Sequence, residues 1–167
     1  KLKRFGETRN IDFLLQAMKS LDEKYSLKIV GAEKSEITEL EKQSRKLGIE
    51  KRIKIYSRVD YSKVAECLLS SSFGILINSS SNTHSTSYTS PLKYFEYLAA
   101  GLKIIAVDFP SHRNLPFSEN IEYYKEGNLE SFVSAIERAR YIKNPDIDLL
   151  KKISLETRAK KISEFIN

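Results

Sequence analysis

The chain has 167 residues, of which 41% are hydrophobic, and its 28 basic and 22 acidic residues give a net charge of +6. That length suits one domain with a buried core, and the lack of a run of about 20 apolar residues, or of an apolar leader in residues 1–10, excludes a membrane span and predicts a cytoplasmic domain. The basic residues are scattered over predicted helices instead of forming one stripe between aromatic residues, which argues against nucleic acid as the partner.

Short β-branched runs alternate with amphipathic segments along the chain, which is typical of βαβ units around a parallel sheet. The first half predicts a helix over residues 11–21, a strand over 27–30, a helix over 35–47, a strand over 53–56, a helix capped by Asp60, and a strand over 73–77. The last of these strands is the most apolar in the chain. We therefore expect it at the centre of the sheet, with both of its faces covered.

A polar stretch over residues 78–89, dominated by serine, threonine and asparagine, follows that strand and is long enough to be an active loop. Beyond it the sequence predicts a helix over 91–100, strands over 104–107 and 121–123, and helices over 129–141 and 148–165. Together these elements predict one α/β, Rossmann-like domain over residues 1–167, with a parallel sheet and helices on both faces.

The front of the chain departs from the usual order, because the first helix begins almost at once, whereas a doubly wound domain ordinarily begins with a strand. We therefore expect residues 1–167 to be a fragment, cut within or just after its first strand.

The sequence lacks the motifs of several enzyme classes. There is no Gly-x-Gly-x-x-Gly turn, as a dehydrogenase would have, and no Walker loop of a nucleoside triphosphatase. A hydrolase triad built from His84, His112 and Asp108 is disfavoured, because no Gly-x-Ser-x-Gly elbow exists. His84 is expected in a solvated loop, and His112 and Arg113 are expected to open a short helix where either side chain can face solvent.

Three further side chains are expected to be structural. Cys67 lies on an apolar helical face beside Val64 and Leu68, which indicates a small buried thiol. Tyr94 and Tyr97 are predicted to be packing residues of their helix.

The start of the helix over 91–100 is the most informative part of the sequence. Ser90 is a good N-cap and Pro91 a natural first helical residue, but Lys93 then adds a positive charge where the helix dipole is already positive. That placement becomes favourable if an anion binds there, with Glu96 one turn later able to accept hydrogen bonds from ribose hydroxyls. An ordinary surface ion pair between Lys93 and Glu96 explains the spacing equally well.

Residues 90–101, SPLKYFEYLAAG, followed by the strand KIIAV over 103–107 and then Asp108, closely resemble the donor-site segment of family-four retaining glycosyltransferases of the GT-B fold. Weaker similarities agree with that family in order and spacing over nearly the whole chain. They cover residues 9–18, 27–31, 48–59 and 156–162.

The resemblance implies that the chain is the C-terminal, donor-binding half of a GT-B enzyme and lacks the N-terminal acceptor domain. It implies that Glu96 holds the nucleotide ribose and that Arg9, with Lys3 or Arg4 as a second residue, neutralises the diphosphate. Backbone amides at the start of this helix, in the segment of Ser90, Pro91 and Leu92, are expected to hold the diphosphate. Arg58 and Val59 are expected to border the base.

The sequence departs from the family pattern at the approach to this helix. The family commonly has a glutamate eight positions before the ribose-binding one, where it contacts the donor sugar, but this chain has Tyr88. The glycine-rich approach is likewise replaced by residues 89–91, TSP. The positive charge of Lys93 suggests that the diphosphate is still recognised here, by a different interaction.

The implied function is transfer of a hexosyl-type sugar from UDP or GDP to a glycan or lipid-linked acceptor, with retention, as in polysaccharide biosynthesis. Arg9 and Lys93 would stabilise charge on the departing diphosphate. No metal or other cofactor is expected, because no Asp-x-Asp pair or ligand cluster occurs in a suitable loop. The domain alone is expected to be inactive, and a basic surface is compatible with peripheral contact at the inner face of a membrane.

The alternative is a non-catalytic α/β module that binds nucleotide or another protein. On that hypothesis, Lys93→Ala and Glu96→Ala would leave every ligand response unchanged.

Overall fold

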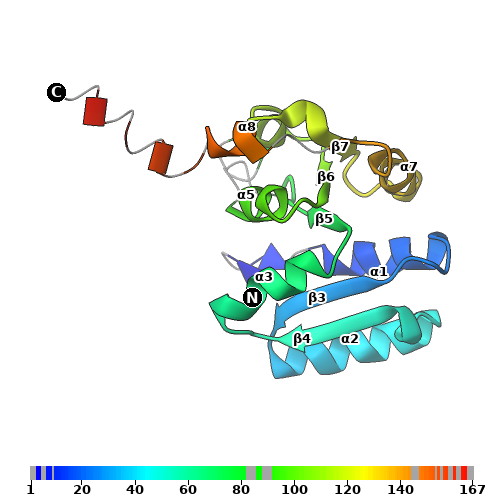
Figure 1. Cartoon of the computed structure of the whole chain (residues 1–167). Coiled ribbons are helices and arrows are strands. Elements are labelled where there is room, and N and C mark those ends of the chain that lie inside the picture. Colours follow the sequence, from blue (N-terminus) through cyan, green and yellow to red (C-terminus); the bar gives the residue numbers. More distant parts are fainter. Residues whose placement is uncertain are drawn as a thin grey trace.

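The structure is a computed structural model, and it describes residues 3–4, 7–8, 10–81, 86–87, 92–143, 147–152, 154, 156–157, 160 and 163–164. Strands and helices alternate along it as the sequence predicts (Figure 1). The elements are β1 Lys3–Arg4, β2 Glu7–Thr8, α1 Ile11–Ser20, β3 Leu27–Ala32, α2 Lys34–Leu47, η1 Glu50–Arg52, β4 Ile53–Ser57, α3 Tyr61–Leu69, β5 Phe73–Leu76, α5 Leu92–Ala99, β6 Lys103–Val107, α6 Pro110–Arg113, η2 Ser118–Asn120, β7 Ile121–Tyr124, α7 Leu129–Ala139 and α8 Ile147–Lys151.

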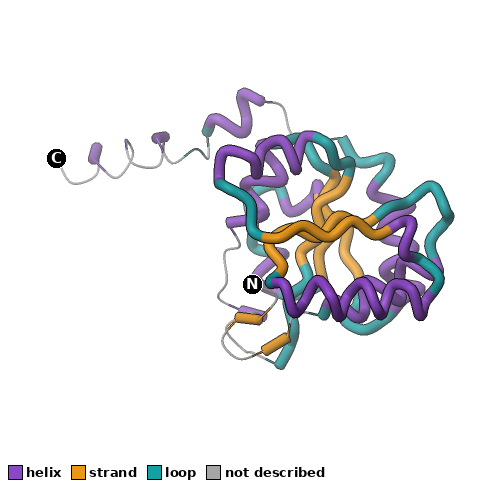
Figure 2. Tube along the Cα trace, turned by 90° about the horizontal axis from the view of Figure 1, so that it is seen from below, coloured by secondary structure: helices purple, strands orange, loops and turns teal. Residues whose placement is uncertain are grey.

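The parallel strands form two sheets in the described part of the chain. β3 pairs with β4, and β5, β6 and β7 pair in that order, every pair being parallel. A short antiparallel hairpin of β1 and β2, which the sequence did not predict, precedes α1. The α/β, Rossmann-like prediction is confirmed, because helices lie on both sides of the strands (Figure 2).

The prediction that the strand over 73–77 is central is wrong. Among the strands that the structure describes, β5 lies at an edge of its sheet, and the central strand is β6. Residues 104–107 of β6 are all buried, whereas buried and half-buried residues alternate along β5. The apolar residues of β5 therefore indicate that helices cover both faces of this strand, and they do not indicate that other strands pair with both of its edges.

Alternation along β6 divides the core into two clusters. Ile105 and Val107 join the side chains of α1 and α7 on one face, while Ile104 and Ala106 join those of α5 on the other. On the first face, Phe13 of α1 stacks on Tyr124 of β7 with ring centroids 5.7 Å apart and meets Phe132 of α7 edge-on at 5.5 Å. These aromatic contacts fix α1 and α7 against the three-stranded sheet.

Arg52 joins the turn after α1 to the start of β4. Its guanidinium donates hydrogen bonds to the carbonyls of Leu21, Asp22 and Tyr25 at 3.2, 2.8 and 2.9 Å. Since these three carbonyls follow the end of α1, one side chain ties the turn after α1 to the residue that precedes β4.

Two predicted helices differ in detail from the structure. Asp60 precedes α3 as predicted, but its side chain makes no capping hydrogen bond. α3 has no fully buried residue, so that Cys67, predicted to be buried, is half-buried.

The prediction of a single helix over 148–165 is also wrong, because α8 ends at Lys151 and a turn follows it. The Lys151 carbonyl accepts hydrogen bonds from the Ser154 amide at 3.2 Å and the Thr157 hydroxyl at 2.8 Å. Side-chain hydroxyls that bind the backbone in this way compete with helix propagation.

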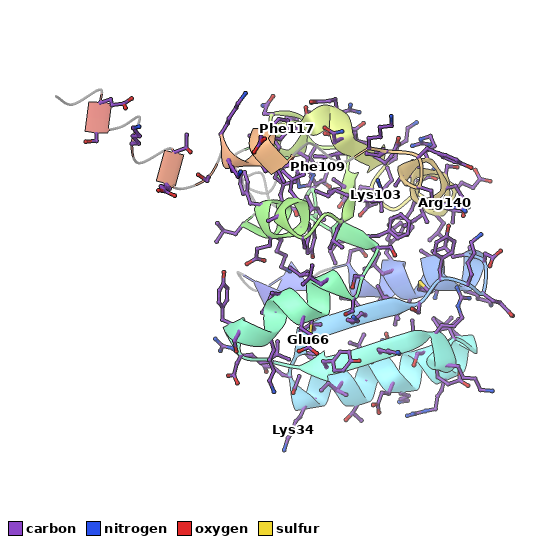
Figure 3. All side chains as sticks on the ribbon, viewed as in Figure 1. Lys34, Glu66, Lys103, Phe109, Phe117 and Arg140 are labelled. Atoms are coloured by element: carbon purple, nitrogen blue, oxygen red, sulfur yellow. The ribbon has the colours of Figure 1, made fainter. Side chains whose placement is uncertain are left out.

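His112 is fully buried, which corrects the expectation that it can face solvent. The imidazole stacks on the ring of Phe109, which is labelled in Figure 3, with ring centroids 6.1 Å apart. Its Nδ1 lies 2.7 Å from the Val107 carbonyl and so carries the proton, while Nε2 is buried and has no hydrogen-bond partner among the residues that the structure describes. Burial lowers the pKa of this imidazole, although the bond to Val107 opposes the shift.

Lowering the pH is expected to destabilise the protein through His112. The folded-state pKa lies below the ordinary value of 6.5, so the stabilising contribution is present above that pH and is lost as the pH falls below it. The loss is at most about 1.4 kcal/mol per pH unit, measured as the free energy of unfolding in urea between about pH 7 and about pH 5.

His112→Phe should remove this pH dependence at little cost, because the Val107 carbonyl keeps the Phe109 amide as a donor at 2.9 Å. His84→Asn is the matched control, since the chain has two histidines, and it should keep the wild-type dependence. A His112→Phe variant that is as acid-sensitive as wild type would contradict the assignment.

Candidate functional site

The carboxyl ends of β5, β6 and β7 meet at one edge of the three-stranded sheet, because the strands are parallel. α5 connects β5 to β6 and packs beside both strands (Figure 1). A helix that connects two parallel neighbouring strands begins at the carboxyl edge and runs back along the sheet. The start of α5 therefore lies at the edge where ligands bind in open α/β sheets.

Side chains of α5 divide into a core face and an outer face. Tyr94 and Leu98 are buried, whereas Lys93 is exposed and Glu96 is half-buried. Leu92, the first residue of the helix, is 80% exposed, so the helix begins at the surface of the protein. Lys93 and Glu96 are thus one turn apart and outside the core, as the sequence predicts.

The remaining residues predicted to bind the diphosphate or the donor sugar lie, in the sequence, near the start of α5 or near the N-terminus of the chain. Ser90, Pro91 and Tyr88 lie outside the described residues, and so does Arg9. The backbone of Lys3 and Arg4 forms β1.

Two tyrosines attach α5 to the sheet, and their predicted packing role is confirmed. Tyr94 is completely buried, and its hydroxyl donates a hydrogen bond to the Pro116 carbonyl. Burial raises the pKa of this hydroxyl far above its ordinary value, so it stays a neutral donor. Tyr97 packs directly over Gly74 of β5.

The loop after β5 is tied to the end of β7. The Ser80 amide donates a hydrogen bond of 2.9 Å to the Glu126 carboxylate. Within the loop the hydroxyls of Ser79 and Ser81 lie 2.9 Å apart, and the Ser81 amide donates to Ser79. The first part of the polar loop is therefore held at the carboxyl edge of the sheet.

An ion pair occupies the neighbouring position after β6. Arg113 donates two hydrogen bonds to Asp108, at 2.8 and 2.9 Å, and lies 3.8 Å from the centroid of the Tyr123 ring. The hydrogen bonds from Arg113 lower the pKa of Asp108, which is therefore ionised and paired. Asp108 therefore has a structural role, as the partner of Arg113 in this ion pair.

Arg58 and Val59 follow β4 at the carboxyl end of the two-stranded sheet. Arg58 is exposed and Val59 is half-buried. In the adjacent strand, Gly31 has φ of +96° where the pairing of β3 with β4 shifts register. Contact of Arg58 and Val59 with a base stays a prediction.

Sequence reasoning missed Gly74 and Glu126. A glycine inside an apolar strand indicates close approach by another group, so Gly74 had a signal that could have identified it. Glu126 had no local signal, because its partner Ser80 is 46 positions away in the chain.

Among the described residues, no group of three or more histidine, cysteine or acidic side chains is arranged to hold a metal ion. Within the same residues, no helix is both long and apolar enough to cross a membrane.

Comparison with known proteins gives one family and two similar structures. The family described as Glycosyl transferases group 1 matches residues 1–154. The crystal structure of Anabaena HepE in complex with UDP is similar with a TM-score of 0.70 and 16% identity, over 95% of this chain and 45% of that chain. The crystal structure of WaaG, a glycosyltransferase involved in lipopolysaccharide biosynthesis, has a TM-score of 0.60 and 17% identity, over 78% of this chain and 34% of that one.

At these identities the two structures establish the fold. This chain spans less than half the length of either of them. No curated protein matches it.

Glu126→Ala should release the loop after β5. The expected result is faster amide hydrogen exchange at Ser80, with global stability reduced by no more than about 1 kcal/mol, because one exposed hydrogen bond is lost. Glu130→Ala, which removes an exposed carboxylate in the first turn of α7, is the matched control. Unchanged exchange at Ser80 in the Glu126 variant would show that the bond does not hold the loop.

Proposed function

The chain belongs to the glycosyl transferases of group 1, and on that premise we propose that it is the part of such an enzyme that binds the nucleotide-sugar donor. The resemblance of residues 90–108 to this family is confirmed by the match. The observation that carries the proposal is the position of α5, which begins at the carboxyl edge of the sheet with Lys93 and Glu96 outside the core.

The donor's diphosphate is proposed to lie against the start of α5. Backbone amides at a helix start and the helix dipole attract an anion, and Lys93 in the first turn adds a full positive charge. The unfavourable meeting of Lys93 with the dipole becomes favourable once a diphosphate is bound. The proposed hydrogen-bond donors are the backbone amides of Ser90 and Leu92, and Pro91, which has no N–H, is proposed to line the same helix start.

Glu96 is proposed to bind the ribose. A carboxylate accepts hydrogen bonds from two adjacent hydroxyls, and its half-buried position one turn below Lys93 suits a group attached to the diphosphate. Arg58 and Val59 at the end of β4 are proposed to border the base. Between the proposed donors UDP and GDP, the similarity to a structure that holds UDP favours UDP.

The proposed reaction moves a hexosyl-type sugar to a glycan or lipid-linked acceptor, with retention of configuration at the anomeric carbon. Negative charge builds on the departing diphosphate as the glycosidic bond breaks. Lys93, the helix amides and Arg9 would stabilise that charge more strongly in the transition state than in the ground state. This electrostatic device requires no metal ion.

The acceptor is proposed to bind to a second domain of the same enzyme, since this chain spans less than half of the similar structures. Alone, the chain should bind nucleotide but transfer little or no sugar. Its formal charge of +6 is compatible with peripheral contact at an anionic membrane surface.

Calorimetric titration with UDP, GDP and ADP tests the proposal. We expect UDP or GDP to bind, and Glu96→Gln and Lys93→Ala each to weaken that binding by about tenfold or more, because each removes a charge-assisted contact. Binding should be unchanged in EDTA.

Glu39→Gln and Lys63→Ala are the matched controls, since both side chains are exposed on other helices. They should bind nucleotide as the wild type does. A folded protein that binds none of the three nucleotides at millimolar concentration would overturn the proposal. Normal binding by both α5 variants would instead favour a module that uses another surface.

A further inference from the structure

We infer that the contact between Tyr97 and Gly74 sets the position of α5 on the sheet and so positions Glu96 for the ribose. Tyr97 and Gly74 act as positioning residues, through the helix, and touch no substrate. This inference rests on the proposed function for its nucleotide readout, but the contact itself can be tested without any ligand.

The ring of Tyr97 fills the space where any other residue at position 74 would have its side chain. Gly74 is buried in β5 and, with Leu76, faces α5. A Cβ atom at Gly74 would lie 2.9 Å from Cε2 of Tyr97 and closer still to Cγ and Cδ2. Real Cβ atoms do not approach so closely, so the ring rests on the backbone of the strand.

A second anchor holds the preceding turn of α5. The Tyr94 hydroxyl donates a hydrogen bond to the Pro116 carbonyl, and the loop that contains Pro116 is itself held by further contacts. Phe117 has a left-handed backbone with φ of +57° and packs its ring into the core cluster beneath α5. Tyr123 donates from its hydroxyl to the Ser118 carbonyl at 3.1 Å. The Tyr94 anchor therefore stays in place when the Tyr97 contact changes.

The two anchors give the helix a pivot. Glu96 is adjacent to Tyr97, while Lys93 is adjacent to the fixed Tyr94. A side chain added at Gly74 would push Tyr97 outward, and α5 would tilt about Tyr94. Glu96 would then move further than Lys93, so that recognition of the ribose would suffer more than recognition of the diphosphate.

Glycine at this position is costly unless the contact has a use. Glycine in a strand interior is less stable than alanine by roughly 0.5–1 kcal/mol, because it loses more backbone entropy and offers no side chain to the core. Close approach by a helix is the physical reason to accept that cost. A smaller residue at position 97 with alanine at position 74 would fill the same space, but α5 would then lie at a different distance from the sheet.

The experiment is a double-mutant cycle of Gly74→Ala and Tyr97→Ala, read by titration with UDP and with inorganic pyrophosphate. Gly74→Ala should weaken UDP binding by about tenfold or more and pyrophosphate binding by no more than about threefold. In the Tyr97→Ala background, adding Gly74→Ala should change UDP affinity by less than about twofold, because no ring remains to be displaced.

Leu98→Ala separates positioning from stability. It removes a buried side chain of the same helix and should lower stability by about 2–5 kcal/mol while keeping the wild-type ratio of UDP to pyrophosphate affinity. If the affinity ratio follows stability in all variants, or if the effects of the two substitutions simply add, the inference is overturned.

Amide chemical shifts test the contact without ligand. Gly74→Ala should shift the resonances of residues 92–99, and the same substitution in the Tyr97→Ala background should not. Unchanged α5 resonances in Gly74→Ala would contradict the inference whatever the protein binds, whereas a wild type that binds no nucleotide would overturn the proposed function. If Gly74→Ala does not fold, restored folding in the double variant supports the contact, and an unfolded double variant contradicts it.

Discussion

The position of α5 on the three-stranded sheet is the constraint on which the proposed site depends. Tyr94, bonded to Pro116, and Tyr97, resting on Gly74, direct one face of the helix into the core. Lys93 and Glu96 consequently lie on the outer face at the carboxyl edge of the sheet. Because packed interfaces are stiff, the backbone positions of Lys93 and Glu96 are fixed before a ligand arrives, which lowers the entropy lost on binding.

Electrostatics at this edge favour an anion beside α5 more than beside its neighbours. Asp108, after β6, is neutralised by two hydrogen bonds from Arg113, and Glu126, after β7, accepts the Ser80 amide. These carboxylates therefore have structural partners of their own. At α5 the helix dipole and Lys93 have the same sign, an arrangement that a bound diphosphate would make favourable.

Element order and type follow from local pattern, and hence most of the fold could be predicted from the sequence. The outer face of α5, with Lys93 and Glu96, could also be predicted, since helical spacing alone separates it from Tyr94. What failed depends on contacts between distant segments. The apolar run of β5 cannot distinguish cover on two faces from strand partners on two edges. The burial of His112 depends on its packing against Val107 and Phe109 and not on a local pattern. Glu126 reaches a loop that no local window contains.

A crystal structure of the protein with UDP bound tests the central claim most directly. The diphosphate should lie against the first turn of α5, near Lys93, with the ribose hydroxyls within hydrogen-bonding distance of the Glu96 carboxylate. If the protein's own side chains cover that helix start, or if UDP binds elsewhere with Glu96 turned away from it, α5 is not the donor site.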